Sequence, residues 1–186
     1  MTNPAAETSP RSVLDFWFGT LKPSQWWEVD AALDASIAGR FGTLLRAALA
    51  GELVAWRATA EGRLAEILVL DQFSRNIHRG TPLAFAADPV ALVLSQEAVA
   101  AGADRALDAQ RAAFVYMPHM HSESAQIHET AVRLFQREGM QDSLRFEKAH
   151  KAIIDRFGRY PHRNAILGRE STAEELEFLR QPGSRF

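Results

Sequence analysis

Apolar residues recur every three or four positions along most of the chain, which is the spacing of an α-helix with one buried face. The longest such stretch begins after Asp30 and ends at Gly51, and another runs from about Gly62 to Asn76. The segment Ile67–Leu70 has the composition of a strand, but it lies inside the second helical stretch. The pattern therefore predicts helices and no strand.

Local start and stop signals divide the chain into about eight helices. The predicted helices begin at polar caps or prolines and end at glycines or a proline. The starts are Ser9-Pro10, Asp30, Gly62, Asp88-Pro89, Asp108, Ser122, Asp142 and the capping box Thr172–Glu175; the ends include Gly19, Gly51, Gly102, Pro118, Gly139 and Gly158. We predict one all-α domain of stacked antiparallel helix pairs over residues 9–186, preceded by a flexible tail over residues 1–8.

Composition limits the classes of partner. The 186 residues suffice for one domain with a sizeable core. Acidic and basic residues nearly balance, 23 against 21, which argues against nucleic acid or a membrane surface as a partner. There is no cysteine, so disulfides, thiolate metal sites and a cysteine nucleophile are excluded. With no apolar run of signal-peptide or membrane-spanning length, we expect a soluble, cytoplasmic protein.

Two charged residues fall on the apolar face of the helix from Gly62. That face carries Leu64 and Ile67, and its continuation brings in Asp71 and Arg75. An unpaired buried charge costs several kcal/mol, so each of the two needs a partner. Either they form a structural ion pair with each other, or they line a polar pocket with other groups.

Histidines supply candidate proton-transfer groups. His150 lies on the same helix face as Phe146 and Ile153, where a hydrogen-bonded core histidine and a catalytic one are both reasonable. His121 and Glu123 follow Pro118 and are predicted to lie at a helix N-terminus, either complementing the helix dipole or forming an acid/base pair.

The segment Arg156–Asn164 concentrates positive charge at the end of a predicted helix. Arginine is suited to binding a carboxylate or phosphate through two parallel hydrogen bonds. The same cations could instead complement the helix C-terminus or pair with Asp71 and Glu123, and Asp155 stands four residues before Arg159. Both an anion site and an internal ion network are therefore open.

Searches for other chemistry find little. The histidines and Glu123 lack HExxH or paired ExxH spacing, and nearby arginines would repel a cation, so we predict no metal. No Walker loop, GxGxxG or GxSxG occurs, and we predict no cofactor.

Several blocks together carry a family resemblance. They are Val13–Gly19, Leu70–Ile77, Tyr116, Pro118, His121–Glu123 and the segment from His150 to Arg169. In these the chain resembles domain-of-unknown-function family 924, which implies a tetratricopeptide-like α-superhelix and no established activity. Ser74, where the family often has proline, and His128, where we would expect glutamine, depart from its pattern. The polar motif positions that the resemblance implies are Asp71, Arg75, Asn76, His121, Glu123, His150, Arg156, Arg159, His162 and Arg163.

Three functions fit these residues. In the first, the arginines with Asp71 and Asn76 bind a small carboxylate or phosphate ligand while His121, Glu123 or His150 moves protons in hydrolysis or group transfer. In the second, a superhelical groove binds an acidic peptide. In the third, the motif residues form a buried ion network that only fixes the packing of the helices.

Overall fold

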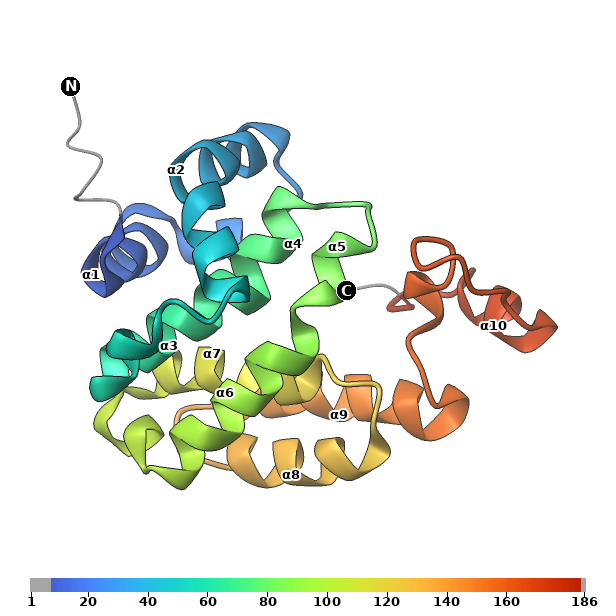
Figure 1. Cartoon of the computed structure of the whole chain (residues 1–186). Coiled ribbons are helices and arrows are strands. Elements are labelled where there is room, and N and C mark those ends of the chain that lie inside the picture. The colour runs from blue at the N-terminus through green and yellow to red at the C-terminus, as the bar shows by residue number, and fades with distance from the viewer. Residues whose placement is uncertain (1–7, 185–186) are drawn as a thin grey trace.

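Helices follow one another along the chain, and the part that the structure describes, residues 8–184, contains no strand (Figure 1). The structure is a computed structural model. Apart from Thr8, the predicted tail over residues 1–8 lies outside the described residues. The helices are α1 Pro10–Leu14, α2 Ala31–Leu49, α3 Ala60–Leu68, α4 Ser74–Ile77, α5 Leu83–Ala86, α6 Asp88–Ala100, α7 Ala109–Met120, α8 Ala125–Phe135, α9 Gln141–Phe157 and α10 Ala173–Phe178.

With α3 and α4 counted as one helix and α5 and α6 as another, these elements form eight helical segments within the described part of the chain, as the sequence predicts. α3 and α4 are joined by a π-helical turn, Val69–Phe73, and α1 continues into another, Asp15–Thr20. A π-turn accommodates one extra residue in a helix and is frequent at functional sites. The turn Val69–Phe73 carries the buried Asp71, so the helix predicted from Gly62 to Asn76 is continuous but widens into a π-turn at this residue.

Several predicted helix ends are confirmed by their caps. Ser9 accepts a hydrogen bond from the Ser12 backbone, Asp30 accepts two from the start of α2, and Thr172 forms the predicted capping box with Glu175. Caps of this kind satisfy backbone N–H groups that have no partner within the helix.

The predicted boundary between α7 and α8 is wrong. α7 continues through Pro118, because the fixed φ of proline is helical and only one hydrogen bond is lost so near the helix end. The N-cap of α8 is Ser124 rather than Ser122, whose N–H instead donates to the carbonyl of His119. α8 also ends at Phe135, earlier than the predicted Gly139.

Helices that are neighbours or next neighbours along the chain pack against each other. α6 packs on α7, α7 on α8 and α8 on α9, while α1 contacts α3 and α2 contacts α4 (Figure 1). α3 joins the two groups, because it packs against α6 and α7 as well as α1. This arrangement confirms the prediction of an all-α fold of stacked helix pairs.

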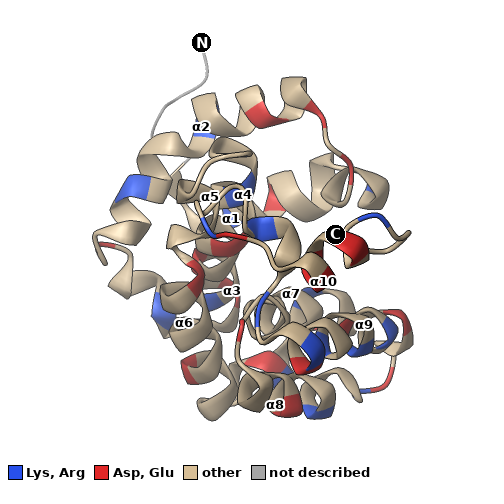
Figure 2. Ribbon diagram, turned by 90° about the vertical axis from the view of Figure 1, so that its right-hand side faces the viewer, with Lys and Arg blue, Asp and Glu red and all other residues tan. Residues whose placement is uncertain are grey.

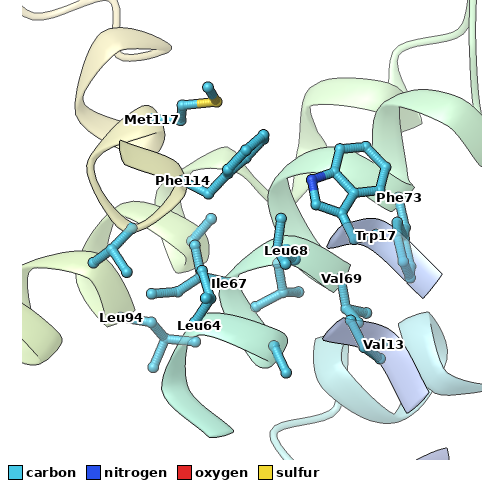
Figure 3. Close-up of a cluster of buried hydrophobic side chains, with 14 of the residues drawn as sticks. Val13, Trp17, Leu64, Ile67, Leu68, Val69, Phe73, Leu94, Phe114 and Met117 are labelled. Atoms are coloured by element: carbon cyan, nitrogen blue, oxygen red, sulfur yellow. The ribbon is translucent and has the colours of Figure 1, made fainter. Parts of the chain in front are cut away.

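The core lies around α3, as Figure 3 shows. Its residues Leu64, Ile67 and Leu68 are almost fully buried and lie among side chains of α1, α6 and α7. Trp17 and Phe73 extend this core, with ring centroids 5.6 Å apart. Burial of such side chains supplies the main stabilising free energy of the fold.

The segment Leu83–Ala100, comprising α5 and α6, is long and apolar enough to cross a membrane by length and composition alone. However, its Ala91, Leu94 and Ala98 are buried in the core, and α6 packs on α3 and α7. α6 therefore contributes one face to the core of this fold.

The C-terminal segment leaves the stack after α9, and α10 lies to one side of it (Figure 1). A second, small apolar cluster of Ile153, Ile154 and Tyr160 with Phe157 and Phe178 joins α9 to this segment. The turn Pro161–Arg163 follows Tyr160 and returns the chain toward α7 and α8. It is this return that brings arginines to the polar centre described next.

Candidate functional site

Side chains from five separate elements meet at one polar centre. Asp71 comes from the π-turn, Arg75 from α4 and Asp88 from the start of α6. His121 is the C-cap of α7, and Arg163 ends the turn after Tyr160. Four of these five were predicted as site residues, and the structure brings those four together around Asp88.

Asp71 is the most buried member of the centre. Its Oδ1 lies 2.7 Å from His121 Nδ1 and 3.2 Å from an Arg75 guanidinium nitrogen, and the Gln72 amide donates to Oδ2 at 2.6 Å. Burial alone would favour the neutral acid, but His121, Arg75 and these hydrogen bonds outweigh it and lower the pKa of Asp71. Asp71 is therefore an ionised carboxylate.

Asp88 links two arginines. It accepts two hydrogen bonds from Arg75, at 2.9 and 3.0 Å, and a longer one of 3.2 Å from Arg163. Arg75 also donates to the backbone carbonyl of Asp71 at 2.6 Å. The predicted pairing of Asp71 with Arg75 is thus confirmed. The bidentate ion pair of Arg75, with two parallel hydrogen bonds, is formed with Asp88.

His121 is held as a neutral, oriented imidazole. Because Asp71 is ionised, the hydrogen between them belongs to His121 Nδ1, which leaves the lone pair on Nε2. Burial and the neighbouring charge of Arg75 lower the pKa of His121, more than Asp71 raises it. Within residues 8–184 no hydrogen bond engages Nε2.

The ring of His121 lines a pocket of about 440 Å³ between α5, α6 and the loop from α7 to α8. The lining residues divide by chemistry into an apolar set, here called the apolar wall, and a polar set, the polar wall. The apolar wall consists of Pro82, Phe85, Ala86, Pro89, Leu92, Pro118 and Leu167, and the polar wall of Asp88, His121, Ser122, Glu123 and Arg163.

Arg163 is the cationic residue among those that line the pocket in the described part of the chain. Its guanidinium lies 4.6 Å from the ring centroids of both Phe85 and Tyr160, and it donates to the His121 carbonyl at 3.0 Å. Only 6% of the residue is exposed, and its buried Nε has no hydrogen-bond partner in the described part of the chain. Burial and then the charge of Arg75 lower the pKa of Arg163. The Nε–H is therefore a donor that lacks an acceptor.

Glu123 lines the same pocket but is fully engaged. It accepts two hydrogen bonds from Arg169, at 2.6 and 2.9 Å, and one from the Tyr160 N–H at 2.7 Å. These contacts outweigh burial and lower the pKa of Glu123, so it carries a charge and no proton to donate. The predicted helix N-terminus around His121 and Glu123 is wrong, because the loop between α7 and α8 holds both residues.

Other predicted ligand-binding residues pair elsewhere. Arg159 forms a two-fold ion pair with Glu175 instead of meeting Asp155, which binds Lys151. The exposed Arg156 pairs with Glu174, and Asn76 donates to Asp34 at 2.8 Å. None of these three predicted residues lines the pocket beside His121. Their contacts are those of the structural ion network, the third hypothesis.

His150 and His162 flank the ring of Tyr160, with centroid distances of 5.8 and 5.5 Å. His150 also hydrogen-bonds the Phe146 carbonyl, and burial lowers its pKa to about 3. The buried face of α9 therefore holds His150 and Ile153, while Phe146 is half exposed rather than inward-facing. His162 lines a different, mainly apolar pocket beside α10.

His128 does not line the pocket but contacts the loop that carries His121. It is fully buried, with Nδ1 2.7 Å from Glu147 and Nε2 donating to the Ser122 carbonyl at 2.8 Å. The hydroxyl of Tyr160 lies 3.2 Å from the same Nε2. His128 thus supports the backbone of the loop that carries His121.

Sequence reasoning missed Asp88, Arg169 and Phe85 as members of the site. An aspartate at the first residue of a helix is sufficiently explained by the helix dipole, so Asp88 did not indicate a site. Arg169 lies after the cationic segment Arg156–Asn164. Only their position in space reveals their role.

Among the described residues, no three His, Asp or Glu side chains are grouped so that they could hold a metal ion. Positive and negative residues are interspersed along the ribbon in Figure 2.

The fold and site define an all-helical protein with a mixed-charge pocket at the junction of its helix pairs. Residues 13–183 match the family described as bacterial protein of unknown function (DUF924), and the chain belongs to this family. Its structure is similar to that of the protein of unknown function ATU0120 from Agrobacterium tumefaciens, with 39% sequence identity and a TM-score of 0.88. That match covers 95% of this chain and 98% of the other. No curated protein matches the chain.

Proposed function

We propose that the pocket beside His121 binds a small molecule that carries a carboxylate and an apolar body. The observation that carries the proposal is the lining of the pocket, which places the guanidinium-bearing Arg163 and His121 beside seven apolar residues. A guanidinium donor next to an apolar surface suits a ligand that has a carboxylate and a hydrocarbon body.

A carboxylate suits this donor better than a phosphate. Dianionic phosphates are normally bound by several donors, whereas here the polar wall also contains the carboxylates of Asp88 and Glu123. The apolar wall, including Phe85 and Leu92, provides contact area for a hydrocarbon body. A pocket of about 440 Å³ lies within the range of about 300–1,000 Å³ that is usual for small-molecule sites. We propose this site for a cytoplasmic protein.

The test is a binding panel of small carboxylic acids with aliphatic or aromatic bodies, each compared with its primary amide. Isothermal titration calorimetry should detect binding of one or more acids and weaker binding of the matched amide. Arg163→Lys keeps the positive charge but removes the planar guanidinium that can bind both oxygens of a carboxylate, and should weaken binding at least about tenfold. Arg156→Ala, which changes an exposed arginine outside the pocket, should bind as the wild type does.

Equal binding by wild type and Arg163→Lys, with both proteins folded by circular dichroism, would refute the proposal. Absence of binding across the panel would favour the structural network instead. That second candidate is supported by the pairing of Arg156, Arg159 and Asn76 with Glu174, Glu175 and Asp34, outside the pocket.

A further inference from the structure

We infer that the pocket is catalytic and hydrolyses a neutral ester or amide, with water as the nucleophile and His121 as the general base. This inference rests on the proposed function, because it takes the bound carboxylate to be the product of the reaction. It is carried by the geometry of Asp71 and His121, whose carboxylate–imidazole hydrogen bond of 2.7 Å fixes the ring and leaves Nε2 without a protein partner in the described part of the chain.

The base is oriented and accessible. Asp71 holds Nδ1–H, so Nε2 carries the lone pair, and the ring of His121 lines the pocket. When the imidazole accepts a proton it becomes a cation, which Asp71 stabilises through the same hydrogen bond. The carboxylate is itself held by Gln72 and Arg75, so its position does not depend on His121.

The charges in the pocket and in the ion pairs beside it favour a substrate that is neutral before it reacts. Three arginines, Arg75, Arg163 and Arg169, pair with three carboxylates, Asp71, Asp88 and Glu123, and His121 is neutral. A carbonyl group brings no net charge into this balanced set. In the transition state its oxygen becomes negative and His121 becomes positive, and the site has the positive charge of Arg163 for the first and Asp71 for the second.

The reaction begins when water attacks the carbonyl carbon while His121 Nε2 takes one of its protons. The positive charge of the Arg163 guanidinium stabilises the oxygen that becomes negative. The tetrahedral intermediate collapses, the bond to the alcohol or amine breaks, and His121 returns the proton to that leaving group. The products are the carboxylic acid, which ionises, and the alcohol or amine. Ser122 also lines the pocket, but no hydrogen bond joins it to His121 within the described residues, so we assign water as the nucleophile.

The experiment measures hydrolysis of the methyl ester, the p-nitrophenyl ester and the p-nitroanilide of whichever acid binds most tightly. His121→Asn is the decisive variant, because its side-chain amide can still donate to Asp71 while the base at Nε2 is removed. We expect hydrolysis above the buffer rate for at least one of these derivatives by the wild type. The rate of His121→Asn should fall by about 100-fold or more, with an unchanged dissociation constant for the free acid. His78→Asn, which replaces a histidine outside the pocket, should retain the wild-type rate.

Each outcome supports or overturns the catalytic role of His121. If the wild type binds the acid but hydrolyses none of its derivatives, the catalytic inference is overturned and the binding site stands. Hydrolysis that is equal in wild type and His121→Asn also overturns it. If His121→Asn loses hydrolysis together with acid binding, His121 is a binding residue and not the base. If no acid binds the wild type, the proposed function and the inference that rests on it both fall, and the titrations distinguish this case from a failure of catalysis alone.

Discussion

The substitution Asp88→Asn tests whether the polar centre holds the fold together. Asp88 is the shared acceptor of Arg75 and Arg163, and the side chains of these three residues are 14%, 19% and 8% exposed. Removing one partner of a buried ion pair costs about 3–5 kcal/mol, while an exposed pair contributes about 0–1 kcal/mol. Arg75 keeps Asp71 as a partner, so we expect a loss of about 2–4 kcal/mol in the free energy of unfolding.

For a domain of this size, that loss lowers the melting temperature by about 4–16 °C. Urea and thermal unfolding followed by far-ultraviolet circular dichroism measure both quantities. Glu174→Gln is the matched control, because it removes an acid from the exposed pair with Arg156 and should cost less than about 1 kcal/mol.

Asp88 also stands at the start of α6, where a carboxylate contributes about 0.3–1 kcal/mol through the helix dipole. A double-mutant cycle with Arg75→Met separates the two effects, since only the ion pair gives a coupling energy, expected at about 1–3 kcal/mol. A loss below about 1 kcal/mol for Asp88→Asn, or no coupling with Arg75, would refute the idea of a mutually dependent network.

Two further predictions concern stability. A Cβ at Gly62 would lie 1.9 Å from the Trp56 carbonyl oxygen, so Gly62→Ala should destabilise the protein by about 1–3 kcal/mol in urea unfolding. Gly39 has open space around it within α2, so Gly39→Ala should stabilise the protein by about 0.5–1 kcal/mol. Equal effects of the two substitutions would contradict this reasoning. The hydrogen bond from Arg159 lowers the pKa of Glu175 to about 2, below the ordinary value of 4.5, so this contribution to stability is present above pH 4.5 and is lost as the pH falls toward 2. Urea unfolding across that range should show a shallower pH dependence for Glu175→Gln than for the wild type, and parallel curves would contradict the assignment.

Helix periodicity predicted the burial of Asp71 correctly, because its position on the apolar face follows from residues only a turn or two away. The π-turn around it could not be predicted in the same way. One extra residue in a helix changes which side chains face each other, but it leaves apolar residues three and four apart on either side. The sequence therefore identified Asp71 and Arg75 as inward residues without giving their final partners.

Partners far apart in sequence are the part that a single sequence does not specify. Asp88 has a sufficient local role at a helix start, and nothing near it indicates contact with Arg163. The reverse holds for Arg156 and Arg159, whose density suggested a ligand site. Each finds an acid on the C-terminal segment, Glu174 or Glu175, because that segment folds back beside α9.

The ion pairs themselves give the reason to consider the pocket separately from the network. Asp71, Asp88 and Glu123 are each satisfied by arginine or histidine, and such a set could be purely structural. His121 Nε2, however, has no protein partner in the described part of the chain, and His121 lines the same pocket as Arg163. An imidazole lone pair and a positive charge are complementary to an attacking water and to a carbonyl oxygen that becomes negative. The site is therefore better explained by a ligand that reacts than by packing alone.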